Sequence, residues 1–239
     1  MCTHYQAPDE DTGINELKIG IGDLFRRTPW KLDVWPDYLA PAVLPDGDGA
    51  AVVAGVYGFW PKFVQPDKTL PNGKKRKKYP TYNARTEEVG EKPLYQKAWR
   101  EGRRCLIPAL WVVEPSYPNA QQDDKGDWIN GPCTWQRVGL TGWRPFCVPG
   151  IWQVNNTKDG PVIGVSMLTL NGEDHEIWRE MHQPVDEKRG VAFLRPADYD
   201  EWLHTPNVEA ARAMVQLYPA NEMSAEPIAG SPVRPGSSH

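Results

Sequence analysis

Residues 105–113, CLIPALWVV, form an apolar run that ends at the carboxylate of Glu114. A short apolar run of this kind, rich in Ile, Val and Trp, is typical of a buried β-strand. Three other runs have the same character, at residues 51–60 (AVVAGVYGFW), 146–154 and 161–170. Strands are therefore expected to dominate the middle of the chain, and the fold is expected to be built around a β-core.

Helices are predicted between and after these runs, at residues 94–100, 174–182, 196–203 and 207–215. Pro196 would open its helix in the first turn, where proline is favoured. A short strand is predicted at residues 192–194. Because the sequence has neither a repeat nor a regular alternation of strands and helices, we predict an α+β fold. Its mixed or antiparallel β-core, barrel-like in form, is expected to be flanked by helices.

The composition is that of an ordinary globular protein. Of the 239 residues, 40% are hydrophobic and 24% are charged, which argues against disorder. We expect a single domain over residues 1–223 and a flexible C-terminal tail over residues 224–239. No apolar run reaches the roughly eighteen residues that a membrane helix needs, and the polar start lacks the layout of a secretory signal. The protein is therefore expected to be cytoplasmic, without a membrane partner.

Charge and cysteine usage narrow the function classes further. The net charge of -4 argues against a protein that coats nucleic acid by bulk electrostatics. Five adjacent cations stand out, and they form either a solvated loop or a phosphate contact site: Lys74, Lys75, Arg76, Lys77 and Lys78. The four cysteines show no C-x-x-C spacing, and Cys2 and His4 have no second pair of ligands. Neither a disulfide framework nor a metal site is expected.

Cys2 occupies a position where residues are usually dispensable. A second interpretation is chemical. Removal of Met1 would leave a first residue that carries a free α-amine and a thiol on adjacent carbons. At neutral pH the amine is substantially unprotonated and the thiol is partly ionised. The two groups together could attack one aldehyde.

Three other residues are candidates for chemistry. Glu114 follows a predicted buried strand, where a carboxylate is either paired structurally or held with a raised pKa for proton transfer. Asn83 is either a turn residue or a member of a site. His182 precedes Gln183 and Pro184, and a lone histidine is more often a surface or satisfied residue than a catalyst.

Several short motifs follow one another in an order typical of one family. Residues 57–61 (YGFWP) are similar to W-G-L-I-P, and residues 83–87 (NARTE) to N-A-R-x-E. Residues 103–109 match R-R-C-L-I-P-A, and Glu114 stands five positions further on. Residues 148–152 (VPGIW) are similar to F-A-G-L-W, and residues 199–203 (YDEWL) to Y-x-x-W-L. With Cys2, these motifs make the chain resemble the SOS-response-associated peptidase (SRAP) family of abasic-site sensors, from Met1 to about Leu203.

The resemblance implies a function and a set of site residues. A SRAP-type fold would sense abasic sites in single-stranded DNA, remove its own Met1 and form a covalent thiazolidine crosslink through Cys2. Cys2 would be the nucleophile, Asn83 and Glu114 would belong to the active site, and His182 would be the acid-base histidine. The implied DNA contacts are Arg85, Arg189, Trp60, Lys74, Lys75, Arg76, Lys77 and Lys78. No cofactor is implied, and the protein is expected to act as a nucleoid-associated monomer.

Three departures from the family pattern bear on these assignments. The usual opening M-C-G-R is replaced by Thr3 and His4 after Cys2, so an arginine that would touch DNA is absent. The usual H-x-R-M-P is interrupted, because residues 183–188 separate His182 from Arg189. We interpret these residues as a small insertion, with His175 as the alternative acid-base histidine. Pro115 also stands where the family has tryptophan.

Two other functions remain open at the level of sequence. The chain would be a noncovalent single-stranded DNA-binding module if the change to Thr3 and His4 accompanied loss of crosslinking. It would be a general cysteine peptidase if Cys2 and His182 acted on other peptides.

Overall fold

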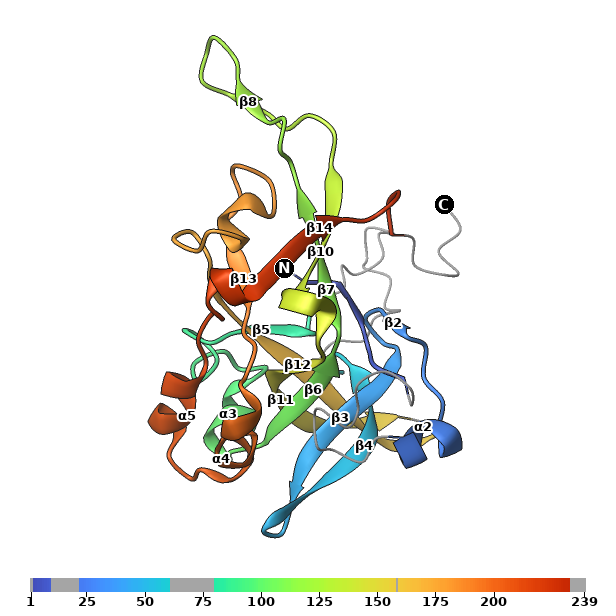
Figure 1. Ribbon diagram of the computed structural model, residues 1–239. Helices are drawn as coiled ribbons and strands as arrows, with labels where there is room; N and C mark the ends of the chain where they lie inside the picture. Colours follow the sequence, from blue (N-terminus) through green and yellow to red (C-terminus); the bar gives the residue numbers. More distant parts are fainter. Residues whose placement is uncertain (1, 10–21, 61–79, 158, 233–239) are drawn as a thin grey trace, which may run out of the picture.

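The computed structural model describes residues 2–9, 22–60, 80–157 and 159–232 (Figure 1). The five cations of residues 74–78 lie outside these ranges, so their DNA contacts stay a prediction.

At the centre, five strands form a ring: β3 (Leu39–Asp46), β4 (Gly49–Tyr57), β6 (Arg104–Ala109), β11 (Phe146–Thr157) and β12 (Gly160–Asn171). The order of pairing is β11–β6–β3–β4–β12, and β12 pairs again with β11, which closes the ring into a barrel. The pair of β4 and β12 is parallel and the others are antiparallel. The predicted α+β fold with a mixed, barrel-like core is confirmed.

A second sheet stands beside the barrel. Its five strands are antiparallel in the order β14 (Met223–Pro227), β10 (Thr134–Leu140), β7 (Trp111–Ser116), β1 (His4–Gln6) and β2 (Asp33–Val34). The apolar run 105–113 is therefore two strands rather than one. It leaves the barrel as β6, breaks at Leu110, whose backbone N–H donates to the carbonyl of Gln6, and enters the second sheet as β7. This run joins the two sheets and brings Glu114 beside the N-terminal strand.

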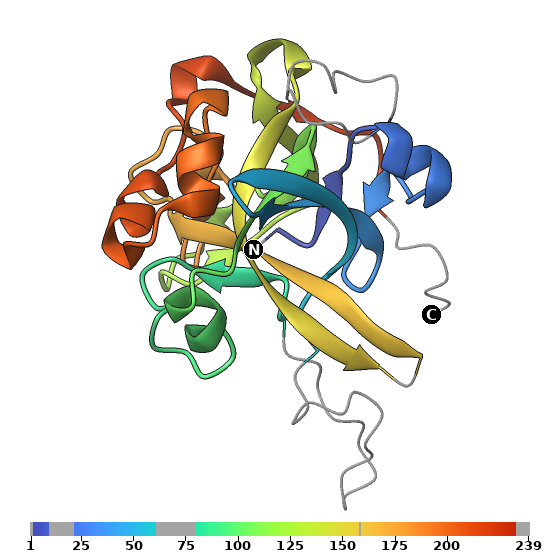
Figure 2. The same ribbon diagram turned by 90° about the horizontal axis from the view of Figure 1, so that it is seen from below.

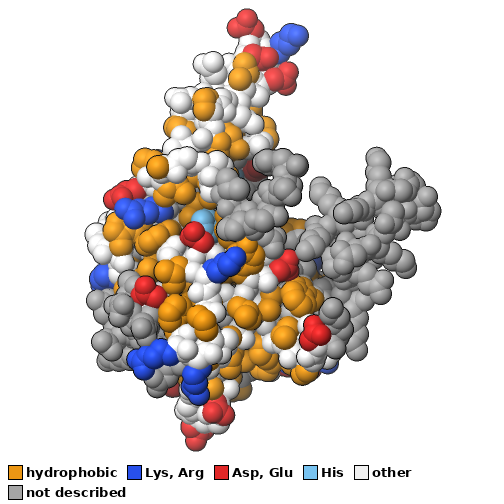
Figure 3. Space-filling view, turned by 90° about the vertical axis from the view of Figure 1, so that its right-hand side faces the viewer, with side chains coloured by type: hydrophobic (Ala, Val, Ile, Leu, Met, Phe, Trp, Pro, Cys, Tyr) orange, Lys and Arg blue, Asp and Glu red, His pale blue; other side chains and the backbone are white. Residues whose placement is uncertain are grey.

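Strand β12 extends beyond the barrel and organises an edge of the molecule. Its first half pairs with β11 and β4, whereas its last residues pair with β5 (Asn83–Arg85) on one side and β13 (Arg189–Val191) on the other. The motif NAR is thus a short strand on a barrel strand. A separate two-stranded arm, β8 (Gln121–Gln122) and β9 (Trp128–Ile129), projects away from the body in Figure 1. Figure 3 shows acidic side chains at its tip, where Asp123, Asp124 and Asp127 lie.

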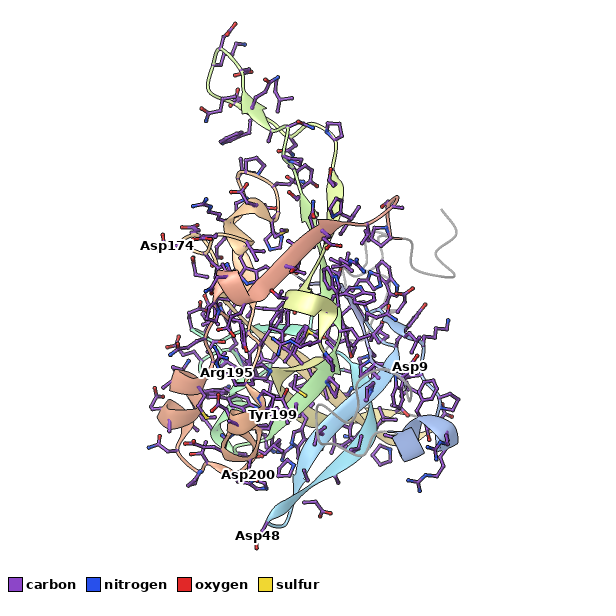
Figure 4. All side chains as sticks on the ribbon, viewed as in Figure 1. Asp9, Asp48, Asp174, Arg195, Tyr199 and Asp200 are labelled. Atoms are coloured by element: carbon purple, nitrogen blue, oxygen red, sulfur yellow. The ribbon has the colours of Figure 1, made fainter. Side chains whose placement is uncertain are left out.

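The helices are short and lie on two sides of the barrel. Figure 2 shows α3 (Gln96–Arg100), α4 (Tyr199–His204) and α5 (Val208–Met214) together on one side, and α2 (Gly22–Arg27) on the other. Trp202 of α4 is fully buried and donates from its indole nitrogen to the carbonyl of Cys105, 2.9 Å away. Tyr199, labelled in Figure 4, accepts a hydrogen bond from the backbone of Cys147. Both contacts attach α4 to the barrel, one to strand β6 and one to strand β11. Within the described part of the chain, no helix has the length and apolar character needed to cross a membrane.

The described residues also include four single-turn 3-10 helices: η1 (Thr141–Trp143), η2 (Trp178–Glu180), η3 (Pro196–Asp198) and η4 (Ala220–Glu222). Pro196 lies in the first turn of η3, which continues into α4, as predicted. Asn207 caps α5 by accepting from two backbone N–H groups. The predicted helices at residues 94–100 and 207–215 are confirmed within two residues at each end.

Three predictions of secondary structure are wrong. Residues 174–182 are not a helix, because the chain turns repeatedly and only η2 is helical; the His175 ring accepts from the backbone N–H groups of Ile177 and Trp178 instead. The strand expected at residues 192–194 is β13, which ends at Val191. The tail does not fray from Ser224, because residues 224–227 continue β14 and pair with β10. The pairings of β13 with β12 and of β14 with β10 depend on partners far away in the sequence, whereas the His175 contacts are local.

Candidate active site

Cys2 is fully buried, and its backbone is held by two side chains from the barrel side of the molecule. The Asn83 amide nitrogen Nδ2 donates to the Cys2 carbonyl oxygen over 2.6 Å, and the Tyr57 hydroxyl donates to the same oxygen over 3.1 Å. The Cys2 thiol donates to the carbonyl of His4 over 3.3 Å. Cys2 is therefore fixed in position, which is unusual so close to a chain terminus.

Glu114 reaches the side chain of Cys2 from strand β7. The register pairs His4 with Val113, which places the residue after Val113 next to the start of the chain. The Glu114 side chain is 1% exposed and lies close enough to the Cys2 side chain for the two groups to influence each other electrostatically. Burial raises the pKa of Glu114 to about 7, because the charged carboxylate is poorly solvated there. Burial, together with the negative charge of Glu114, also raises the pKa of the Cys2 thiol well above its usual range.

His182 completes the cluster from the loop after η2. Its Nδ1 lies 3.6 Å from the Glu114 carboxylate oxygen Oε2, and its backbone N–H donates to the carbonyl of Pro115 over 2.6 Å. Burial lowers the pKa of His182 to about 3, so the ring is neutral at neutral pH. The contact with Glu114 is then not an ion pair. Since Nε2 faces the carbonyl oxygen of Arg189 at 3.2 Å, Nε2 carries the proton and Nδ1 presents its lone pair to Glu114.

The four residues predicted as catalytic, Cys2, Asn83, Glu114 and His182, thus lie together, although they come from four separate segments. His175 does not join them, because its Nε2 contacts the carbonyl of Tyr218 and its Nδ1 accepts from η2. The geometry therefore favours His182 over His175 as the histidine of the site.

Tyr57 is a site residue that the sequence analysis missed. It is fully buried, and besides the Cys2 carbonyl its hydroxyl reaches the sulfur of Met167 at 3.4 Å. The only signal in the sequence was its place at the head of the motif YGFWP, where the family has tryptophan. A hydroxyl at that position provides a hydrogen-bond donor whose partner the linear sequence does not reveal.

Comparison with known proteins decides the family. The model of the family described as SOS response associated peptidase (SRAP) matches residues 1–231. The chain belongs to this family. A solved structure from Bordetella bronchiseptica is 25% identical to this SRAP protein, with a TM-score of 0.73 over 95% of this chain and 99% of the other. No curated protein matches the chain.

Two further solved structures share the fold. A protein from Bacteroides thetaiotaomicron is 14% identical, with a TM-score of 0.65, over 95% of this chain and 92% of the other. A phage-related protein from Bordetella bronchiseptica is also 14% identical, with a TM-score of 0.64, over 96% of this chain and 95% of the other. Family membership supports a general role associated with DNA damage and abasic sites.

The two arginines that the SRAP resemblance implies as DNA contacts have different environments. The Arg85 side chain is 40% exposed and pairs with Glu187 at 2.7 Å. The Arg189 side chain is only 4% exposed, and its guanidinium pairs with Glu87 and Glu187 and donates to the carbonyl of Thr169. A DNA contact stays a prediction for Arg85, whereas the burial of Arg189 favours a structural role.

Trp60 and His4 also have definite surroundings in this SRAP protein. Trp60 is 38% exposed, and its indole nitrogen donates to Asp37 over 2.7 Å, so the ring is held at the surface. His4 is buried, stacks on Trp35 with ring centres 4.4 Å apart and contacts the Asp33 carboxylate at 3.1 Å. The residue at the position of the family's arginine is therefore packed into the protein. Among the side chains that the structure describes, no group of three or more His, Cys, Asp or Glu residues could hold a metal ion.

Proposed function

We propose that this protein senses abasic sites in single-stranded DNA and forms a covalent thiazolidine crosslink through Cys2 after it has removed its own Met1. The observation that carries the proposal is the buried carboxyl group of Glu114, which interacts electrostatically with the Cys2 side chain and whose pKa is raised to about 7 by burial. Such a group is present in both its acid and its base form at neutral pH, which is what general acid-base catalysis requires.

The first chemical step opens the abasic sugar to its aldehyde. Ring opening moves a proton from the anomeric hydroxyl to the ring oxygen. Protonated Glu114 would donate to the ring oxygen, and the lone pair on Nδ1 of His182 would accept the hydroxyl proton. The pair is suited to this exchange because His182 is neutral and its Nδ1 faces Glu114 at 3.6 Å. A direct proton donation from a charged His182 is disfavoured, because burial lowers its pKa to about 3.

The second step forms the imine. The α-amine of Cys2 attacks the aldehyde carbon, a C–N bond forms, and the oxygen leaves as water after protonation. Glu114 would supply that proton and take back one from the nitrogen. The hydrogen bonds from Asn83 and Tyr57 to the Cys2 carbonyl support this step, because they fix the orientation of the residue that carries the amine.

The third step closes the ring. The Cys2 sulfur adds to the imine carbon, the thiol proton ends on the nitrogen, and the product is a five-membered thiazolidine. Since burial raises the pKa of the thiol, the thiolate is scarce at neutral pH and a base must accept the proton as the S–C bond forms. Glu114 would be that base, because its buried carboxyl group interacts electrostatically with the Cys2 side chain. Amine and thiol on one residue make the step intramolecular.

Removal of Met1 must come first, because the amine of Cys2 is otherwise tied up in a peptide bond. In this self-cleavage, water adds across the bond between Met1 and Cys2, and the products are free methionine and a chain that begins at Cys2. Cys2 and Glu114 would take part as nucleophile and base.

The test compares adducts on abasic and undamaged oligonucleotides. Intact mass should show a chain that begins at Cys2, and wild-type protein should give an adduct with abasic single-stranded DNA that survives denaturation. The matched control is Cys2→Ala with the same free N-terminus, which keeps the amine and should give an adduct only after borohydride reduction of the imine.

Other results would select another function. Equal noncovalent binding to both oligonucleotides, with no adduct from a chain that begins at Cys2, would identify a binding module. Cleavage of unrelated peptides that depends on Cys2 and His182 would identify a general cysteine peptidase.

A further inference from the structure

The guanidinium of Arg85 is already occupied by a carboxylate of the same chain. Arg85 ends strand β5, two residues after Asn83, and its Nη2 lies 2.7 Å from Oε2 of Glu187. Both side chains are partly exposed, 40% for Arg85 and 35% for Glu187. Glu187 belongs to residues 183–188, the segment that interrupts the family motif between His182 and Arg189. The carboxylate is therefore supplied by a segment that departs from the family motif.

The same carboxylate also contacts a second arginine. Oε1 of Glu187 lies 2.9 Å from Nη1 of Arg189, so its two oxygens engage two guanidinium groups. Arg189 keeps another partner, because both oxygens of Glu87 contact its guanidinium. Two anionic oxygens that bridge two arginines resemble the non-bridging oxygens of a phosphodiester. The position of Glu187 therefore marks an anion site beside the candidate active site.

The backbone around Glu187 is held in place independently of its side chain. The ammonium group of Lys188 donates to the carbonyls of Met181, His182 and Gln183 over 2.9, 3.3 and 2.9 Å. Withdrawal of the Glu187 carboxylate from Arg85 consequently requires a change of side-chain rotamer and leaves the loop contacts of Lys188 intact.

The local charge balance disfavours DNA while Glu187 stays in place. The guanidiniums of Arg85 and Arg189 face the carboxylates of Glu87, Glu88 and Glu187, and Lys92 pairs with Glu88, which is three positive groups against three negative ones. A phosphate that approaches Arg85 meets a neighbourhood without excess positive charge, and Coulomb attraction is the main source of nonspecific DNA affinity.

We propose that Glu187 is an intramolecular competitor for the DNA phosphate at Arg85, and that it thereby limits the affinity for single-stranded DNA. This inference rests on the proposed DNA-binding function and concerns noncovalent binding only. A phosphate group takes the place of the Glu187 carboxylate on Arg85, and the carboxylate turns out into solvent.

The test measures binding of a labelled, undamaged single-stranded oligonucleotide by fluorescence anisotropy at several salt concentrations. Glu187→Gln should bind about three- to tenfold more tightly than wild type at low salt, because an exposed competing charge is removed. The matched control is Glu88→Gln, which removes an equal charge but from a carboxylate 3.8 Å from Arg85 and 2.8 Å from Lys92. Its affinity should stay within about twofold of wild type.

The gain should require Arg85. In an Arg85→Ala background, Glu187→Gln should bind no more tightly than Arg85→Ala alone. If Glu187→Gln fails to fold, Glu187→Asp keeps a charge for Arg189 but reaches Arg85 less well, and it should change affinity in the same direction. The inference is overturned if Glu187→Gln binds no more tightly than wild type, or if Glu88→Gln gives the same gain.

Crosslinking to an abasic oligonucleotide separates this inference from the proposed chemistry. A tighter Glu187→Gln complex without any adduct would support the competitor and contradict the crosslinking function. Adduct formation by wild type, with unchanged noncovalent affinity in Glu187→Gln, would support the crosslinking function and contradict the competitor.

Discussion

Two neighbouring regions of this protein handle ionisable side chains in opposite ways. In the buried cluster of Cys2, Glu114 and His182, lack of solvent pushes each group toward its neutral form. At the arginine edge of Arg85 and Arg189, each guanidinium is paired with a carboxylate. The difference shows that burial adjusts proton affinity where chemistry is proposed, whereas pairing controls which charges a DNA strand can reach.

The two regions are close because β12 supports both. Its last residues pair with β5, which carries Asn83 and Arg85, and with β13, which begins at Arg189. The Arg189 carbonyl also accepts from the His182 ring. A change at one region can therefore be compared with a change at the other in the same scaffold.

The largest expected effect breaks the buried cluster. Glu114→Gln should slow adduct formation at least about 100-fold, because the general acid-base group is lost. The variant should be supplied with Cys2 already exposed as the first residue, checked by mass, so that a failure to remove Met1 does not cause the loss. Single-turnover rates from denaturing gels give the measurement. As a control, Glu88→Gln removes a carboxylate from the arginine edge and should leave the rate of adduct formation at saturating DNA unchanged. A rate for Glu114→Gln within tenfold of wild type would contradict the assignment of Glu114 as the general acid-base group.

Stability as a function of pH tests whether burial sets the proton affinities. The pKa of Glu114 is raised from 4.5 to about 7, so its contribution to the free energy of unfolding is fully present below pH 4.5 and is lost as the pH rises to 7, on the order of 3 kcal/mol. The pKa of His182 is lowered from 6.5 to about 3, so its contribution is present above pH 6.5 and is lost as the pH falls.

Between pH 4.5 and 6.5, the contribution of Glu114 to the free energy of unfolding falls with rising pH while that of His182 rises. Single variants should separate the two contributions. His182→Gln should become less stable from pH 4.5 to 7 relative to wild type, and Glu114→Gln should become more stable as the pH rises through the same range. Denaturant unfolding at a series of pH values measures both. Parallel pH profiles for the two variants would show that burial does not set these pKa values.

Trp60 is an uncharged candidate contact to DNA, so its loss can be compared with the loss of a charge at the arginine edge. Trp60→Leu should weaken binding of undamaged single-stranded DNA about tenfold, because stacking of a base on the exposed ring is lost. The slope of affinity against salt should not change, since no charge is removed. Trp128→Leu is the matched control, because Trp128 is similarly exposed, at 43% against 38%, but lies on the projecting arm. Equal losses for the two variants would argue against Trp60 as a stacking platform.

The smallest effect concerns the second donor to Cys2. Tyr57→Phe should slow adduct formation about two- to tenfold, the usual value of one neutral hydrogen bond, and should leave the affinity for undamaged DNA unchanged. Tyr5→Phe is the matched control: the Tyr5 ring packs edge-on against Tyr57, but its buried hydroxyl has no hydrogen-bond partner among the described residues. If the two variants react at the same rate, the Tyr57 hydroxyl does not position Cys2.

Sequence patterns predicted much of the core. The runs at residues 51–60, 146–154 and 161–170, and the first part of the run at 105–113, became barrel strands because they bury β-forming side chains. The mixed, barrel-like character followed from the absence of a repeating strand–helix pattern. The helices α3, α4 and α5 were also predicted. Two of them follow a local signal, which is Pro196 before α4 and the Asn207 cap before α5. The family motifs further identified Cys2, Asn83, Glu114 and His182 as a group.

Predictions that depended on distant partners failed or were incomplete. Residues 174–182 have the composition of a helix, but Nε2 of His175 contacts the distant Tyr218 carbonyl while its Nδ1 accepts from Ile177 and Trp178 and holds a turn. Residues 224–227 were expected to belong to a flexible tail, but they form the end of β14 and pair with β10. Arg189 was expected at the DNA surface, yet Glu87 and Glu187 enclose it.

By itself, the sequence determined the α+β class, the strand-forming runs and the order of motifs that is typical of the SRAP family. These features depend on local composition and spacing. Only the tertiary structure decided that CLIPALWVV divides between the barrel and the second sheet, that Tyr57 joins Asn83 on the Cys2 carbonyl, and that Glu187 covers Arg85. The reason is physical. Hydrogen bonds and ion pairs are directional contacts over about 3 Å, and the chain segments that make them are brought together only when the barrel closes.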